Sequence, residues 1–217
     1  MLLLAPTLVN LAPAELADAV RTRFGSELRR LGAFTQLCQV GAQACIEASG
    51  TGGRLGVLLA TEHGALTATR AALDDGPRRG EPAMPFTFIG MQPHLAGVLL
   101  AQRGHPVTRS AHLHLADEDW SLLLTVARGW LAECERVLVG WVEESDSPDV
   151  EHKSDWCLLQ KEPFSGAVRV EPVRNEGKAA DATADDWIER LATWRTGSNV
   201  PLLLRGGEDA WRFALEG

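Results

Sequence analysis

The chain has 217 residues, of which 45% are hydrophobic and 23% charged, a composition typical of one ordinary globular domain. Its net charge of −8 argues against nucleic acid or an anionic membrane surface as a partner, because both need clustered lysine and arginine. No apolar segment is long enough to span a bilayer, and the first basic residue is Arg21, so we expect a cytoplasmic protein without a signal peptide.

Apolar patterning in chain order predicts strands that alternate with helices. Strands are expected at residues 2–9, 54–60, 107–115, 136–142, 156–160, 167–173 and 200–204. Helices are expected at 14–23, 26–48 with a break near Gly32, 65–73, 91–102, 117–133 and 185–194. Alternation of this kind indicates an α/β fold built in layers.

Three segments carry more specific predictions. The short apolar run at 54–60 is typical of a strand whose two faces are both covered. The strands at 156–160 and 167–173 flank a Lys-Glu-Pro-Phe turn and are expected to pair as a hairpin. We expect residues 175–217 to form a helix-and-strand extension of a single domain that covers 1–217.

The four cysteines form no C-x-x-C pair, which argues against a zinc site, and they are too few for a disulfide framework in a chain of this length. Cys38 and Cys45 are seven residues apart, which places them on one face of a helix. We therefore expect all four, including Cys134 and Cys157, to be buried structural thiols.

Common catalytic motifs are missing. The glycine-rich residues 50–53 lack the G-K-[ST] ending of a P-loop, and no G-x-G-x-x-G opens a helix after a strand. No G-x-S-x-G turn is present either. Ser121 comes nearest to a nucleophile at a helix start, but its position favours a structural role in the first turn.

Two histidines stand two residues apart on an expected strand. His112 and His114 should therefore face the same side of the sheet. A metal site would need at least one further ligand from elsewhere, so polar walls of an interface or cavity are the favoured interpretation. No metal or cofactor is expected.

The order of segments from Phe34 to Val142 resembles the N-terminal half of the β-ketoacyl synthases, which have a thiolase-like fold. Four stretches carry the resemblance: Arg-Leu-Gly-Val-Leu-Leu-Ala-Thr at 54–61, the stretch from Pro85 to Gly97, Gly-His-Pro-Val-Thr at 104–108, and Leu-Val-Gly-Trp-Val-Glu-Glu at 138–144. The resemblance implies a thiolase-like half-fold: a mixed, mainly five-stranded sheet covered by helices.

The sequence departs from that family where its chemistry would lie. The resemblance places the nucleophilic cysteine near His114 or Leu115, yet residues 112–116 contain neither cysteine nor serine. Three carboxylates follow at 117–119, and these would raise a thiol pKa. The two histidines of the family's second half have no counterpart in a chain of this length. We therefore expect a pseudoenzyme.

Short proteins of this pattern resemble the chain length factors of aryl polyene, type II polyketide and fatty-acid-type biosynthesis. The resemblance implies a non-catalytic subunit that forms a heterodimer with an active β-ketoacyl synthase and bounds its acyl tunnel, with an acyl carrier protein reached through the complex. Candidate tunnel residues are Phe86, Phe88, Met91, His112 and His114. Candidate interface residues are Val107, Arg109, Ala111, Leu113 and Trp120.

Two other functions stay open at the level of sequence. One is an acyl-carrier-protein-binding scaffold that has no ketosynthase partner. The other is a stand-alone enzyme on a re-purposed thiolase-like half, with His114 and Asp117 as acid and base.

Overall fold

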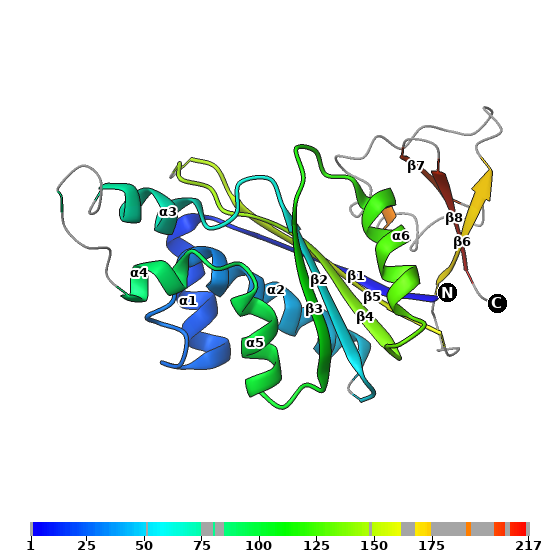
Figure 1. Ribbon diagram of the computed structural model, residues 1–217, viewed down its shortest axis with the longest axis horizontal. Helices are drawn as coiled ribbons and strands as arrows, with labels where there is room; N and C mark the ends of the chain where they lie inside the picture. Colours follow the sequence, from blue (N-terminus) through cyan, green and yellow to red (C-terminus); the bar gives the residue numbers. More distant parts are fainter. Residues whose placement is uncertain are drawn as a thin grey trace.

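The computed structural model describes residues 2–50, 52–74, 80, 85–147, 149–161, 168–174, 190–191, 202–206 and 209–215. The strands in these ranges are β1 (Leu2–Leu11), β2 (Leu55–Thr61), β3 (Val107–His114), β4 (Arg136–Glu143), β5 (His152–Gln160), β6 (Val168–Arg174), β7 (Leu202–Gly206) and β8 (Asp209–Leu215). The helices are α1 (Pro13–Phe24), α2 (Ala33–Ser49), α3 (Leu66–Leu73), α4 (Pro85–Gly90), α5 (Leu95–Gln102) and α6 (Trp120–Trp130) (Figure 1).

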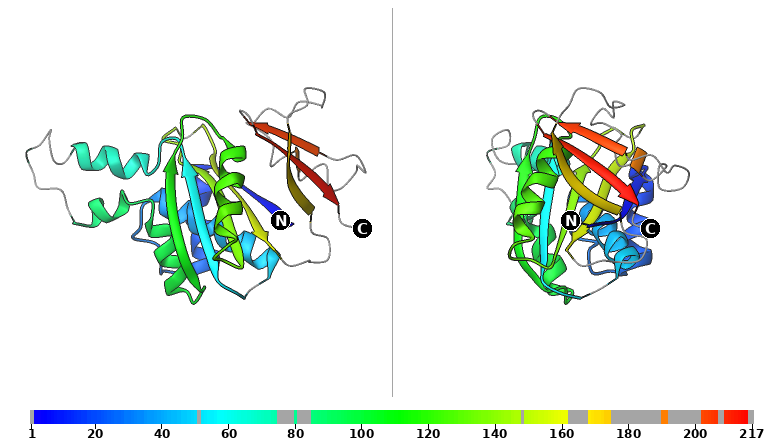
Figure 2. Two further views of the ribbon diagram at one scale, coloured as in Figure 1. Left: turned by 45° about the vertical axis from the view of Figure 1, so that its right-hand side comes forward. Right: turned by 90° about the vertical axis from the view of Figure 1, so that its right-hand side faces the viewer.

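The described strands lie in the order β3-β2-β4-β5-β1-β6-β8-β7. β3, β2 and β4 are parallel, whereas β5 and β1 are antiparallel to their neighbours, so these five strands form a mixed sheet. This confirms the expected five-stranded mixed sheet. The remaining three strands continue it through two residue pairs, Leu2 with Arg169 and Leu3 with Val168. Figure 2 shows these three strands turned away from the other five.

The five-stranded sheet is covered on both faces, as the apolar run at 54–60 predicts. Every residue of β2 is buried. Val57 and Leu59 pack with the side chains of α1, α2 and α5, whereas Leu58 and Ala60 pack with those of α6. Two separate apolar cores therefore lie on opposite faces of one sheet, which is the expected reason for a strand without polar alternation.

The helix expected at 26–48 is confirmed only after Gly32, because residues 25–30 form turns instead. Gly32 is the N-cap of α2 with an extended backbone (φ −60°, ψ 155°), and the helix runs from Ala33 to Ser49. Its buried stripe includes Leu37, Cys38 and Cys45, which pack on the sheet. All four cysteines are free and buried, as predicted.

The expected hairpin of the strands at 156–160 and 167–173 is wrong. β1 lies between β5 and β6 and pairs antiparallel with both. Adjacency in sequence favours a hairpin, but the N-terminal apolar strand competes for the same edge of β5 and occupies it. The pairing register of β1 shifts between Leu4 and Thr7, and this irregularity accommodates Pro6, which has no N–H to donate.

Two other elements differ from expectation. The helix predicted at 91–102 begins only at Leu95, because a separate short helix, α4, precedes it and Pro93 lies in the turn between them. The C-terminal segment also contains β8, which is not among the expected strands and pairs with β6 and β7. The helix expected at 185–194 lies outside the described residues, except for Arg190 and Leu191, which are helical.

None of the described helices is both long and apolar enough to cross a lipid bilayer.

Candidate functional site

The candidate site lies at the carboxyl ends of β2 and β3. The chain leaves β2 toward α3, whereas it leaves β3 toward α6 on the opposite face of the sheet (Figure 1). In open α/β sheets, neighbouring strands whose connections diverge in this way leave a crevice beyond their carboxyl ends. β3 is also the first strand of the sheet, and β2 is its neighbour among the described strands.

Glu143 organises the polar groups at these strand ends. One of its oxygens, Oε1, accepts a hydrogen bond from the Thr61 hydroxyl at 2.9 Å and another from the Glu62 amide. The second oxygen accepts one from the His63 amide at 3.3 Å and lies 3.4 Å from the His63 Nδ1. The carboxylate at the end of β4 therefore fixes the loop that follows β2.

His112 and His114 lie on the same side of β3, as their spacing predicts. Their rings meet edge to face with 4.5 Å between centroids. His114 Nδ1 lies 3.4 Å from the Glu62 carbonyl oxygen, beside the loop that Glu143 fixes. Burial lowers the pKa of His112 to about 4, with smaller contributions from His114 and His94, so this ring is neutral at pH 7.

No described group of three histidine, cysteine or acidic side chains is arranged to hold a metal ion. The pair His112 and His114 therefore lacks a third ligand within the described part of the chain. Their role as polar walls of an interface or cavity stays a prediction.

Carboxylates lie just before the first turn of α6. Asp119 is its N-cap, and Oδ1 accepts a hydrogen bond from the Leu122 amide at 2.9 Å. Glu118 accepts one from the Trp120 indole at 2.6 Å and forms an ion pair with Lys153. Burial alone would lower the pKa of Lys153, but the carboxylates of Glu118 and Asp155 outweigh it and raise that pKa. A helix start occupied by carboxylates does not stabilise a thiolate.

The cysteines lie elsewhere, in the two apolar cores. Burial raises the pKa of Cys38 and of Cys157 well above the ordinary thiol value, and it raises that of Cys45 to about 12. Cys134 Sγ lies 3.6 Å from the Thr108 hydroxyl, near the amino end of β3 and far along the strand from His114. The Cys38, Cys45 and Cys157 thiols therefore stay protonated at pH 7 and are poor nucleophiles.

Ser121 is also occupied. It is buried, and its hydroxyl oxygen accepts a hydrogen bond from the Trp211 indole on β8 at 3.2 Å. This contact holds the C-terminal strands against α6 and agrees with the structural role expected for Ser121.

The residues predicted to line a tunnel fall into two groups. Phe88 on α4 is 58% exposed, and Met91, the first residue after α4, is half-buried. Phe86 belongs to α4, but its side chain lies outside the described residues. The structure thus places Phe88 and Met91 together at the end of α4, and His112 and His114 on β3.

The residues predicted to form an interface differ in position. Val107, Ala111 and Leu113 on β3 are half-buried, and Arg109 is exposed, with its guanidinium 3.2 Å from Glu133. Trp120 is instead 0% exposed. The helix face that carries Trp120 packs under the C-terminal strands of the same chain, so its indole lies beneath the surface.

No protein-family model and no curated protein matches the sequence. Solved structures do match. The ketosynthase ApeO in complex with its chain length factor ApeC, from Xenorhabdus doucetiae, aligns over 98% of this chain and 98% of the matched chain, with a TM-score of 0.64 and 13% identity. The chain has the ketosynthase fold.

Two further structures agree on this fold. The ishigamide ketosynthase/chain length factor aligns over 81% of this chain and 68% of the matched chain, with a TM-score of 0.55 and 15% identity. A type II polyketide acyl-carrier protein in complex with its ketosynthase bound to the hexaketide aligns over 74% and 62%, with a TM-score of 0.53 and 13% identity. The ketosynthase fold expected from the order of motifs is confirmed.

Sequence reasoning missed the groups that Glu143 and Lys153 bring together. Both lie on strands whose patterns are dominated by apolar runs, and their polar partners come from segments 35 to 82 residues away. The one signal in the sequence was the pair of acidic residues at the carboxyl end of β4, a buried parallel strand.

Proposed function

We propose that this chain is a non-catalytic ketosynthase-like subunit, a chain length factor that pairs with an active β-ketoacyl synthase and bounds its acyl tunnel. The observation that carries the proposal is the position of β3 in the sheet together with the residues at its carboxyl end. Among the described strands β3 lies at the edge of the sheet, and it ends in His114 without a thiol, beside a helix start capped by Asp119.

The edge position supports a partner. An edge strand presents backbone N–H and C=O groups to another strand, and an uncovered one invites aggregation. Thr108, Arg109 and Ser110 are exposed on β3. In the ketosynthase-like family, dimers form along this strand, so a companion ketosynthase would satisfy these groups by antiparallel pairing.

Exposed apolar side chains on α4 and α5 also support a partner. Phe88 and Ile89 on α4 are 58% and 43% exposed, and Val98 on α5 is 44% exposed. α5 packs directly on β3, so closely that a Cβ at Gly97 would meet the Ser110 side chain. These exposed apolar groups match a surface that another subunit covers.

Phe88 and Met91 are the side chains that we propose to limit the length of the partner's acyl tunnel. A ring that reaches into the partner's acyl pocket stops chain growth by steric overlap, because overpacking costs more than the extra methylenes gain. The solved structures that share the fold include a ketosynthase with its chain length factor and a ketosynthase with its acyl-carrier protein. By analogy, the carrier protein would reach this chain through the ketosynthase complex.

The test is affinity capture of the tagged full-length chain from its native host, followed by mass identification of the captured proteins. We expect a β-ketoacyl synthase in a fixed ratio to the bait. A matched pair of variants locates the interface: Val98→Glu beside β3 should lower capture, whereas Val150→Glu in the loop before β5 should not. Both valines are exposed, so both variants should fold.

Two outcomes would remove the proposal. One is the absence of any ketosynthase among the captured proteins. The other is an acyl thioester on one of the four cysteines of the purified chain, since that would give the chain its own condensation chemistry. Capture of an acyl carrier protein alone would favour a scaffold instead.

A further inference from the structure

The short helix α4, which carries the proposed gate residue Phe88, meets α3 and the turn before α2 at three small residues. A Cβ added at Gly90, the last residue of α4, would lie 3.7 Å from the Ala68 Cβ on α3. A Cβ added at Gly32 would lie 3.8 Å from the same Ala68 atom and 3.6 Å from the Gly90 carbonyl oxygen. Gly32, Ala68 and Gly90 therefore form one junction, to which Ala68 contributes the only side chain.

Phe88 lies on the face of α4 that points away from this junction. Successive residues of an α-helix are about 100° apart around its axis, so Phe88 is about 200° from Gly90. The exposure agrees with this geometry, because Gly90 is buried and Phe88 is 58% exposed. A movement of α4 away from α3 would therefore carry Phe88 outward from its own chain.

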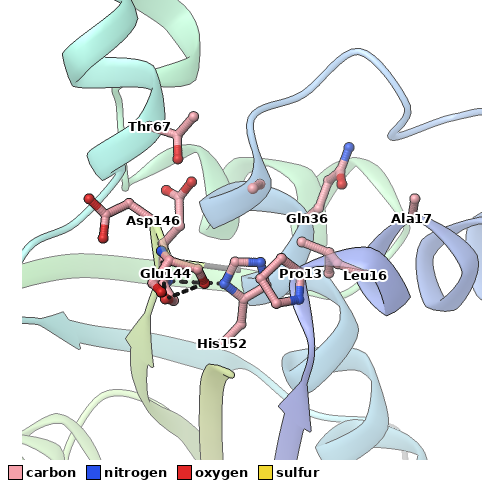
Figure 3. Close-up of a pocket in the computed structure, with 11 residues that line it drawn as sticks. Pro13, Leu16, Ala17, Gln36, Thr67, Glu144, Asp146 and His152 are labelled. Carbon is pink, nitrogen blue, oxygen red and sulfur yellow. Dashed lines mark hydrogen bonds between the residues drawn. The ribbon is translucent and has the colours of Figure 1, made fainter. Parts of the chain in front are cut away.

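α3 is the anchored side of the contact. Its first turn lies against the loop that follows β4, where Glu144 faces the Thr67 hydroxyl and the amides of Leu66 and Thr67. Figure 3 shows Thr67 beside Glu144 and Asp146. Burial raises the pKa of Glu144, although hydrogen bonds from these groups offset part of the rise. Arg70, further along α3, forms an ion pair with Asp146. The loop thus holds α3 at two places.

α4 is the less anchored side. Two of its last three residues, Phe88 and Ile89, are 58% and 43% exposed. The chain then continues through turns, and the Met91 amide donates to the Phe88 carbonyl oxygen at 3.2 Å. These turns lead to α5, which is fixed near its start because the Gln39 side chain donates to the Ala96 carbonyl oxygen at 2.9 Å. A push from α3 would therefore rotate α4 about the turns that join it to α5.

We propose that the size of the side chain at position 68 sets how far Phe88 projects toward the ketosynthase, and thereby the length of the acyl chain. This inference rests on the proposed function. Ala68 is a positioning residue, because it contacts α4 and acts on the acyl chain only through Phe88. A larger side chain overfills the junction, and backbone shifts relieve such overpacking. Since α3 is held, α4 moves, and the products become shorter.

The experiment compares Ala68→Val and Ala68→Leu with the native chain, each purified together with the ketosynthase that the native chain captures. Mass spectrometry of the products should show a graded shift, and the mean length in Ala68→Leu should be shorter by at least one extension unit. The amount of captured ketosynthase should not change, because Ala68 is half-buried within its own chain. If Ala68→Leu does not fold, the smaller Ala68→Val carries the same test.

Two variants control for added bulk. Gly90→Ala places its methyl group 3.7 Å from the Ala68 Cβ, an ordinary van der Waals contact, so it should leave the product length unchanged. Ala14→Leu adds the same side chain as Ala68→Leu at an exposed position of α1, and it should also leave the length unchanged. A shift in Ala14→Leu as large as in Ala68→Leu would overturn the proposal.

A double variant tests whether Ala68 acts through Phe88. Phe88→Ala removes the ring, so Ala68→Leu in that background should shift the length much less than it does alone. A merely structural effect of the larger side chain would persist without the ring. Unchanged length in both Ala68 variants with normal capture, or a full shift in the Phe88→Ala background, would overturn this proposal alone. If the native chain captures no ketosynthase, the proposed function fails with it.

Discussion

Two glycines enclose the indole of Trp156, and this contact allows a quantitative test of the core. Trp156 on β5 is fully buried and lies opposite Gly140 on β4. A Cβ at Gly140 would lie 2.5 Å from the ring atoms Cε3 and Cζ3 of Trp156. A Cβ at Gly41 on α2 would meet the other side of the indole, at Nε1 and Cδ1. The indole also donates to the Ser154 hydroxyl at 2.8 Å, which restricts its movement.

Gly140→Ala should therefore destabilise the fold. Overpacking of a core costs about 1–3 kcal/mol, and the lower entropy of the unfolded alanine chain returns about 0.4–1 kcal/mol. The net loss is on the order of 1–2 kcal/mol. With a urea m-value of about 3 kcal/mol/M, the unfolding midpoint should fall by about 0.3–0.7 M at unchanged m.

Two controls decide whether the indole is the cause. A methyl group added at Gly129 on α6 would meet no neighbouring atom within 4 Å, so Gly129→Ala should raise stability by about 0.4–1 kcal/mol. In a Trp156→Phe background, which removes the ring atoms that clash, Gly140→Ala should cost less than it does in the native background. An unchanged cost in that background, or a Gly140→Ala variant as stable as the native chain, would refute the reasoning.

Three further predictions concern function and the two faces of the sheet. Phe88→Ala and Phe86→Ala should lengthen the products of the complex without abolishing synthesis, and mass spectrometry that finds unchanged lengths in both would remove them as gates. The folded pKa of His112 is about 4 and the unfolded value about 6.5, so the unfolded chain binds more protons between them. The free energy of unfolding should then fall as pH drops from about 6.5 toward about 4. Urea unfolding at several pH values should show a smaller loss of stability over this range for His112→Gln than for the native chain. An NMR titration midpoint of His112 near the unfolded value would contradict the prediction. Trp211→Phe should cost about 1–2 kcal/mol in thermal or urea unfolding, because the buried Ser121 hydroxyl loses its donor; an unaltered midpoint would mean that the C-terminal strands are held without this bond.

The local pattern was enough to place most elements of the five-stranded sheet and the helices that cover it. The apolar run at β2 determined burial on both faces, and Gly32 determined where α2 begins, because both effects depend on neighbours in sequence. The missing thiol at the end of β3 was equally readable, since it is a property of residues 112–116 alone.

Pairing between distant segments was decided by the tertiary structure. β1 displaced the expected hairpin because an N-terminal apolar strand and β6 compete for the same edge of β5, and local propensity does not rank such competitors. Trp120 is buried within the chain and is not at its surface, because β8, absent from the sequence prediction, lies over α6.

The two carboxylates at the end of β4 show the same division most clearly. Glu143 and Glu144 are adjacent and chemically identical, and the sequence predicted only an acidic loop. The fold turns Glu143 toward the Thr61 hydroxyl and the amides after β2, where its charge is satisfied. It leaves Glu144 only 4% exposed beside the first residues of α3, where burial raises its pKa. Residue type sets the charge, but only packing sets how much of it is solvated.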